Sequence, residues 1–291
     1  MDATALFFIV FSALMHALWN LQVKQSGDKT VFIWWMFVAS GFLMNVMMVF
    51  LPEPFPVPHG VTWLWAIVGA ICFVLYHLFN GIAYRQGDLS LTYPLAQTSM
   101  IYVPLWGILF LHEQLTPGGI VGVVCVIAGA YCVQLPDFSA KSILRPVRNL
   151  SNPSVRAALA AGFIYSIGSI ADKSGITDYS PFYFTYILVM MMLLIMTLNL
   201  CRNRYRGRVL QEWHHHKRLI LYSGPVMLGS FISFRYGLSL SPVSYAVPVR
   251  QVNVLFGVLI GLLFLRESYG RVRVTAACLI LLGVLNIHLG G

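Results

Sequence analysis

The chain contains the same pattern twice. Gln97 and Gln251 occupy matching places at a constant offset of 154 positions (251 − 97), and the same offset relates the apolar run 107–113 to the run 261–267. An internal repeat of this kind restricts the architecture before any single residue does. The sequence therefore predicts two structurally similar halves.

The N-terminal parts of the halves also correspond, at a smaller offset of 149 (165 − 16). The residues that keep it are His16 with Tyr165, Asn20 with Ser169, and Lys24 with Lys173. A five-residue insertion between the blocks reconciles the two offsets. We predict a first repeat over residues 1–135, a connecting loop over 136–153 and a second repeat over 154–291.

The composition requires a lipid environment for most of this chain. Hydrophobic residues make up 58% of the sequence and charged residues only 10%, whereas soluble domains average about 25% charged residues. About 20 apolar residues cross a bilayer core of roughly 30 Å. On this basis ten spans are expected: 3–23, 32–51, 62–84, 91–111, 118–135, 155–171, 181–200, 218–237, 244–264 and 271–288.

Five spans per half is an odd number, so the second half enters the membrane from the opposite side. The expected fold is an all-α membrane protein with ten transmembrane helices in two inverted five-helix repeats, which in transporters enclose the substrate site. The net charge of +9 does not indicate nucleic acid, because the basic residues lie mainly in loops between spans. The N-terminus has no basic region before its apolar run and is interpreted as the first span.

The chain resembles the EamA-like group of the drug/metabolite transporter superfamily over its whole length. The resemblance is carried by His16, Trp19, Asn20 and Lys24, by Pro94, Pro104, Glu113, Thr116, Gly122 and Gly129, and by Pro248, Glu267 and Gly283. It implies transport, in a bacterial inner membrane, of substrates such as amino acids, sugars, nucleotide sugars, quaternary amines or drugs. The second copy departs from the pattern with Val258 in place of Pro104.

The basic residues concentrate in the odd-numbered loops, which the positive-inside rule places in the cytoplasm, with both termini outside. Relatives of this size usually have cytoplasmic termini. The two orientations remain alternatives.

Polar and aromatic side chains recur three or four residues apart on several spans, so they share helix faces that should turn away from lipid. We expect this set to bind substrate: His16, Trp19, Asn20, Tyr76, His77, Asn80, Gln97, Tyr165, Ser169, Arg235, Arg250 and Gln251. The alternative for the uncharged members is interhelical hydrogen bonding that holds the bundle together.

Arg250 lies inside an apolar span, and Arg235 is expected at similar depth. Two guanidinium groups at one level would hold a carboxylate or phosphate. Alternatively, Arg235 reaches the interface and Arg250 pairs with Asp172 or a helix-end carbonyl. Asp172 is the candidate for proton coupling, unless it is a loop residue paired with Lys173. His16 and His77 could also take up protons.

Three other features have structural interpretations. Glu113 and Glu267 are expected to cap the helix that follows each of them. The run 214–216, three histidines, is predicted to be a solvated loop rather than a metal site. The prolines at 94 and 248 should kink their helices, and the five cysteines read as small apolar packing residues.

The sequence therefore predicts a secondary transporter that moves a small anionic or zwitterionic metabolite by alternating access. Amino acids, organic acids and phosphorylated compounds are the candidate substrates, and no cofactor or metal is expected. The chain lacks a phosphate-binding GxxxxGK[ST] loop and the HExxH and GxSxG motifs. The alternatives are an exporter of amphipathic drugs or metabolites without an anion requirement, and an intramembrane lipid-modifying enzyme. We expect a monomer or a homodimer in a lipid bilayer, with a proton as candidate coupling ion.

Overall fold

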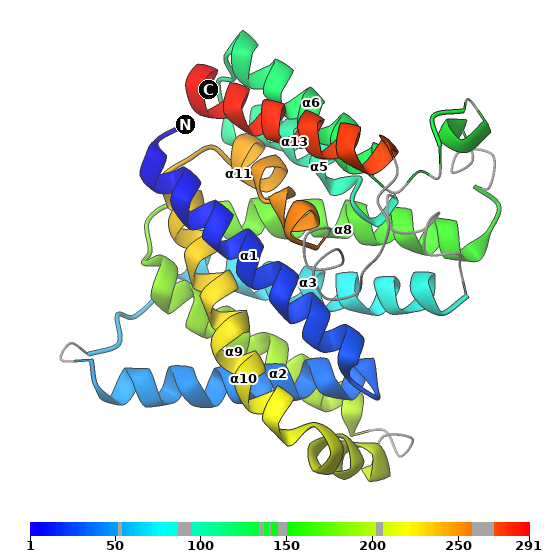
Figure 1. Cartoon of the computed structure of the whole chain (residues 1–291). Coiled ribbons are helices and arrows are strands. Elements are labelled where there is room, and N and C mark those ends of the chain that lie inside the picture. The colour runs from blue at the N-terminus through cyan, green and yellow to red at the C-terminus, as the bar shows by residue number, and fades with distance from the viewer. Residues whose placement is uncertain are drawn as a thin grey trace.

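The computed structural model describes residues 1–51, 54–86, 95–133, 135, 137–139, 141–144, 150–201, 206–257 and 271–291. The regular structure in these residues is helical (Figure 1). The main helices are α1 (Ala3–Gln25), α2 (Lys29–Val49), α3 (Gly60–Gln86), α5 (Ser99–Leu111), α6 (Pro117–Cys132), α8 (Pro153–Gly175), α9 (Pro181–Leu200), α10 (Arg206–Ser239), α11 (Val243–Val249) and α13 (Arg271–Gly290).

Six of these helices are long and apolar enough to cross a membrane: α1, α2, α3, α8, α9 and α13. Helices α5 and α6 are apolar but shorter. The described residues thus agree with a multi-span helical protein, and the count of ten spans stays a prediction. Tyr93, Pro94, Val258 and Glu267 lie outside the described residues.

Helices α6 and α13, which correspond to one another in the two halves, pack side by side through glycine. A Cβ added to Gly122 would lie 2.6 Å from the carbonyl oxygen of Gly283, and one added to Gly129 would lie 2.8 Å from that of Ala276. Gly122 is equivalent to Ala276 in the other half, and Gly129 to Gly283, so the two contacts are related by the symmetry of the repeat. Residues later in α6 contact residues earlier in α13, so the two helices run antiparallel.

Helices α2 and α9, the next corresponding pair, show the same relation. Nε1 of Trp34 donates to Oγ1 of Thr197 at 2.9 Å, and the hydroxyl of Tyr186 donates to Oδ1 of Asn45 at 3.1 Å. Helix α1 packs on α10 and α3 packs on α8 (Figure 1), and these two contacts are equivalent because α1 corresponds to α8 and α3 to α10. In the pairs α2–α9 and α6–α13, the corresponding helices pack against each other in opposite directions, as expected for inverted repeats.

The expected span over 244–264 is not a continuous helix in its described part. Helix α11 ends at Val249, Arg250 and Gln251 form a turn, and helical structure resumes over 252–257. The amide of Gln251 donates to the carbonyl of Pro248, three residues back, instead of continuing the i−4 ladder. The first half also has a turn before α5 begins, at residues 97–98, one position beyond the residues 96–97 that match 250–251.

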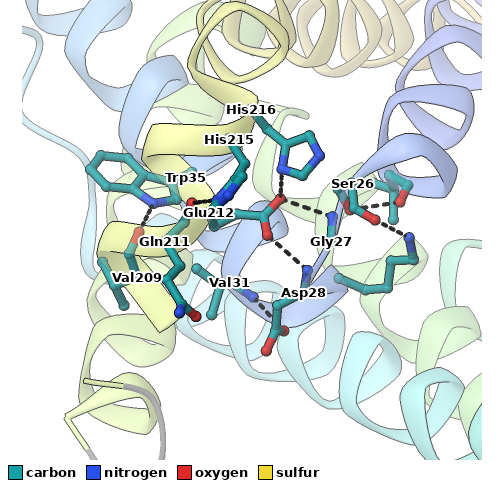
Figure 2. Close-up of polar contacts among 12 residues, drawn as sticks. Ser26, Gly27, Asp28, Val31, Trp35, Val209, Gln211, Glu212, His215 and His216 are labelled. Carbon is teal, nitrogen blue, oxygen red and sulfur yellow. Dashed lines mark hydrogen bonds and ion pairs between the residues drawn. The ribbon is translucent and has the colours of Figure 1, made fainter. Parts of the chain in front are cut away.

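The segment 214–216 is not the predicted loop, because α10 begins at Arg206 and includes these histidines, although His214 and His215 are exposed as expected. Figure 2 shows how this first part of α10 is anchored. The buried carboxylate of Glu212 accepts the amide of Gly27 at 3.0 Å and that of Asp28 at 2.8 Å, and it lies 2.9 Å from Nδ1 of His216. Trp35 adds a hydrogen bond from Nε1 to the carbonyl of Val209. These contacts hold the segment against the α1–α2 turn, and α10 kinks at His216.

Glu113 caps a helix, but not the one that follows it. Its carboxylate accepts the amides of Val243 at 2.7 Å and Ser244 at 3.0 Å, at the start of α11 in the other half. The side chain of Thr116 caps α6 instead. The chain turns at His112, which adopts a left-handed conformation with φ of 54°, and the amide of Glu113 bonds back to the carbonyl of Gly107. This helix-ending motif directs Glu113 away from α6.

Candidate functional site

A small cavity lies where five helices or their ends meet. It is lined by His16 and Trp19 of α1, Phe73, Tyr76 and His77 of α3, Tyr165 and Asp172 of α8, Phe231, Phe234 and Arg235 of α10, and Arg250 at the end of α11. The centre of a water-sized sphere can explore about 40 Å³ of it. Ligand pockets usually measure about 300–1,000 Å³, so this conformation admits water but no metabolite.

Arg250 reaches this cavity from the turn that interrupts its helix. Its guanidinium donates to the hydroxyl of Tyr165 at 3.2 Å, to Oγ of Ser230 at 3.2 Å and to Nδ1 of His16 at 3.3 Å. It also stacks over the ring of Phe234, with 4.1 Å between Cζ and the ring centroid. All of these partners are neutral or aromatic. Within the described residues no carboxylate lies within ion-pair distance of Arg250, although only 8% of its surface is exposed.

Arg235 has a different environment from Arg250. Its Nη2 donates to both carboxylate oxygens of Asp172, at 3.0 and 2.9 Å, and both side chains are buried. Asp172 lies in α8 rather than in a loop, and its neighbour Lys173 donates instead to the carbonyls of Leu238 and Ser241. Asp172 is therefore a helix residue that pairs directly with Arg235 rather than with Lys173. Within the described residues Arg235 has a carboxylate in direct contact, whereas Asp172 acts on Arg250 only through a longer-range electrostatic attraction.

Aromatic rings form one wall of the cavity. Trp19 lies edge-on between His16 and His77, with centroid distances of 4.9 and 6.0 Å. Tyr76 lies 4.9 Å from Tyr165. Such rings present apolar faces together with a few polar edges, so the wall suits the organic body of a small molecule.

Five of the predicted residues are not among those that line the cavity. Asn20 is exposed, Asn80 is buried, and the hydroxyl of Ser169 bonds back to the carbonyl of Tyr165 in its own helix. Gln97 and Gln251 bond to one another. Their predicted role in substrate binding stays a prediction.

Four contributors to the site were not predicted: Phe73, Ser230, Phe231 and Phe234. The repeat carried a signal for the last three, because the 154-residue offset places Ser230, Phe231 and Phe234 opposite Tyr76, His77 and Asn80. An aromatic or small side chain in an apolar segment does not by itself indicate a binding site. Only the alignment of the two halves could have identified these three residues. The described residues contain no group of three or more histidine, cysteine, aspartate or glutamate side chains that could hold a metal ion.

Comparisons with known proteins agree with this geometry. The family model described as the EamA-like transporter family matches residues 3–135 and again residues 153–289. One solved crystal structure superposes with a TM-score of 0.73 at 15% identity, covering 98% of this chain and 96% of the other. At this identity the likeness concerns the fold alone. No curated protein matches the sequence.

Proposed function

The chain belongs to the EamA-like transporter family of the drug/metabolite transporter superfamily, and from this premise we propose that it is a secondary transporter of small organic anions. Members of the family are transporters, and the chain is a multi-pass membrane protein. The proposed substrates carry a carboxylate or phosphate on an apolar or aromatic body, as organic acids, amino acids and phosphorylated metabolites do.

The observation that carries this proposal is that, among the described residues, no carboxylate is in contact with the buried guanidinium of Arg250. A buried cation without a counter-ion is costly in a low-dielectric interior. Nε of Arg250 is buried and has no hydrogen-bond partner in the part of the chain that the structure describes, so one donor of the guanidinium is unused there. An anionic substrate would supply both the missing charge and the missing acceptor, and a guanidinium matches carboxylate and phosphate groups in a bidentate manner.

The pairing of Asp172 with Arg235 bears on the choice among anions. Asp172 is the acidic residue among the described lining of the cavity, and both of its oxygens are bound to Arg235. The described lining therefore offers no unpaired carboxylate to an ammonium group. The aromatic wall could still receive a cation through the faces of Trp19 and Tyr76. We therefore rank simple anions above zwitterions.

The mode of action that we propose is alternating access. The present cavity is too small for a metabolite, so it corresponds to a closed state that must expand to load substrate. The helix interruptions at residues 97–98 and 250–251 lie within one residue of matching places in the two halves. Broken helices at a repeat interface are where secondary transporters bind their substrates.

Uptake into proteoliposomes tests the proposal. A panel of radiolabelled carboxylates, amino acids and sugar phosphates is presented to the wild type, to Arg250→Gln and to Arg250→Lys, with Arg208→Gln as a control at an exposed arginine. We expect at least one anion to be transported, Arg250→Gln to abolish its transport, and Arg250→Lys to retain part of it. Unchanged transport of every anionic solute by Arg250→Gln would contradict the anion site.

The second candidate is an exporter of amphipathic compounds that needs no anionic group, and the aromatic wall favours it. It predicts that neutral or cationic amphipaths compete for transport, and that Arg250→Gln leaves their movement intact. The same panel, extended with such compounds, distinguishes the two functions.

A further inference from the structure

The contact between Arg250 and His16 bears on the protonation and tautomer of the His16 imidazole. Nη2 of Arg250 lies 3.3 Å from Nδ1 of His16. A guanidinium has only donors, so a hydrogen bond across this contact requires Nδ1 to present its lone pair and His16 to be neutral with its proton on Nε2. With this hydrogen bond formed, the cavity holds an unprotonated histidine against an arginine that has no carboxylate in contact among the described residues.

A proton on Nδ1 would reverse this contact. The imidazolium would present a donor and a positive charge to the donors and positive charge of Arg250, so the hydrogen bond would be lost. Both groups line the same cavity. An anion placed between them could accept from both and neutralise one of the two charges.

We propose that His16 is the proton-binding site of this transporter, and that its proton is carried together with the anion bound at Arg250. This inference rests on the function proposed above and adds the coupling ion to it. Linkage is reciprocal: the anion strengthens protonation of His16, and protonation of His16 strengthens binding of the anion. A proton gradient would therefore drive the anion in the direction in which protons flow.

The other titratable and charged groups around the cavity are arranged differently. His77, from α3, lies beyond the ring of Trp19, and no hydrogen bond joins it to Arg250 among the described residues. Asp172, from α8, has both oxygens engaged by Arg235 of α10, so a proton could be added there only at the expense of that ion pair. The hydroxyl of Tyr165 receives a hydrogen bond from Arg250. Among these groups His16 and Tyr165 offer a lone pair directly to Arg250, and of these two side-chain types only an imidazole ordinarily titrates near neutral pH.

Binding of benzenesulfonate as a function of pH tests the inference. This probe is a small aromatic anion that stays ionised at every pH used, so any pH dependence belongs to the protein. The dissociation constant is measured by calorimetry in nanodiscs between about pH 5 and pH 8, where histidine titrates. For the wild type we expect binding to weaken as pH rises, by up to about tenfold per pH unit for one linked proton.

Variants assign the proton to a residue. His16→Gln offers Arg250 a neutral acceptor that cannot titrate, so its pH slope should vanish whatever its affinity. His77→Gln and Asp172→Asn should keep the slope, as should His215→Gln at an exposed histidine outside the cavity. If His16→Gln does not fold, heats measured in two buffers of different ionisation enthalpy report proton uptake by the wild type, by His77→Gln and by Asp172→Asn. Proton uptake on binding in all three proteins supports His16 as the proton-binding residue.

The contrary outcomes separate the two proposals. Binding that depends on Arg250 but not on pH, or a slope that survives in His16→Gln or disappears in Asp172→Asn, would overturn the coupling role of His16 alone. Benzenesulfonate that binds equally well to Arg250→Gln, or does not bind to the wild type, would overturn the anion site and the coupling with it.

Discussion

Gln97 and Gln251 hold the same position in the two copies of the repeat, and their side chains bond to each other. Nε2 of Gln251 donates to Oε1 of Gln97 at 3.3 Å. Two equivalent residues can meet only where a two-fold axis passes between them. The axis that relates the halves therefore passes through the turns that interrupt their helices, beside Arg250.

Replacing both glutamines should cost less than the sum of the two single replacements. In Gln97→Leu or Gln251→Leu one amide loses its partner, at a cost of about 1–3 kcal/mol for a buried polar group. The double variant removes both groups, and we expect a coupling of about 1 kcal/mol in the free energy of unfolding. Equilibrium unfolding of the four proteins in detergent measures it. Strict additivity would show that the contact has no energetic weight.

Gly122→Ala should destabilise the protein, because the new methyl group would meet backbone. It would lie 2.6 Å from the oxygen of Gly283 and 2.9 Å from the amide nitrogen of Ile287, and overpacking of this kind costs about 1–3 kcal/mol. The matched control is Gly81→Ala, within α3, where nothing lies within 4 Å of the added carbon. There we expect a gain of up to about 1 kcal/mol from helix propensity. Equal effects at the two sites would contradict the close α6–α13 contact.

Glu113→Ala should loosen α11 rather than α6. The amides of Val243 and Ser244 lose their acceptor, and loss of a helix cap costs about 0.5–2 kcal/mol. Hydrogen exchange should accelerate at these two residues. Thr116→Ala, which removes the cap of α6, is the control and should accelerate exchange in α6 instead. Faster exchange at the start of α6 in Glu113→Ala would show that the capping contact across the halves is not formed.

Asp172→Asn should be far more damaging than the loss of the whole ion pair. It leaves Arg235 buried and unpaired, at a cost of about 3–5 kcal/mol. The double variant Asp172→Asn with Arg235→Gln removes both charges, so most of that loss should be recovered. Thermal unfolding of the single and double variants measures the difference. A double variant as unstable as the single one would argue against an uncompensated charge as the cause.

Glu212→Ala should free the α1–α2 turn from the first part of α10. The amides of Gly27 and Asp28 would lose the buried carboxylate that accepts from them, at about 1–3 kcal/mol. Exchange at these two amides should rise. Gln211→Ala, at the exposed neighbour, should change stability by less than about 0.5 kcal/mol. Unchanged exchange in Glu212→Ala would mean that the turn is held by other contacts.

Local patterns in the sequence anticipated the helices but not all of their ends. The apolar run after residue 217 predicted a span, yet the polar residues before it also form helix, because Glu212 and Trp35 bind them to the α1–α2 turn. Glu113 was predicted correctly as a cap, but with the wrong partner. A rule based on nearness in the chain selects α6, whereas the left-handed turn at His112 sends the carboxylate to α11.

The sequence alone determined that this chain is helical, apolar and duplicated, because hydropathy and the repeat follow from the order of the residues and need no knowledge of where they lie in space. Only the tertiary structure decided which arginine has a carboxylate in direct contact. Asp172 reaches Arg235 across 63 positions, and Arg250 reaches His16 across 234. Such pairings depend on where distant helices meet in space, and charge alone cannot distinguish Arg235 from Arg250. The function proposed for this protein depends on that difference.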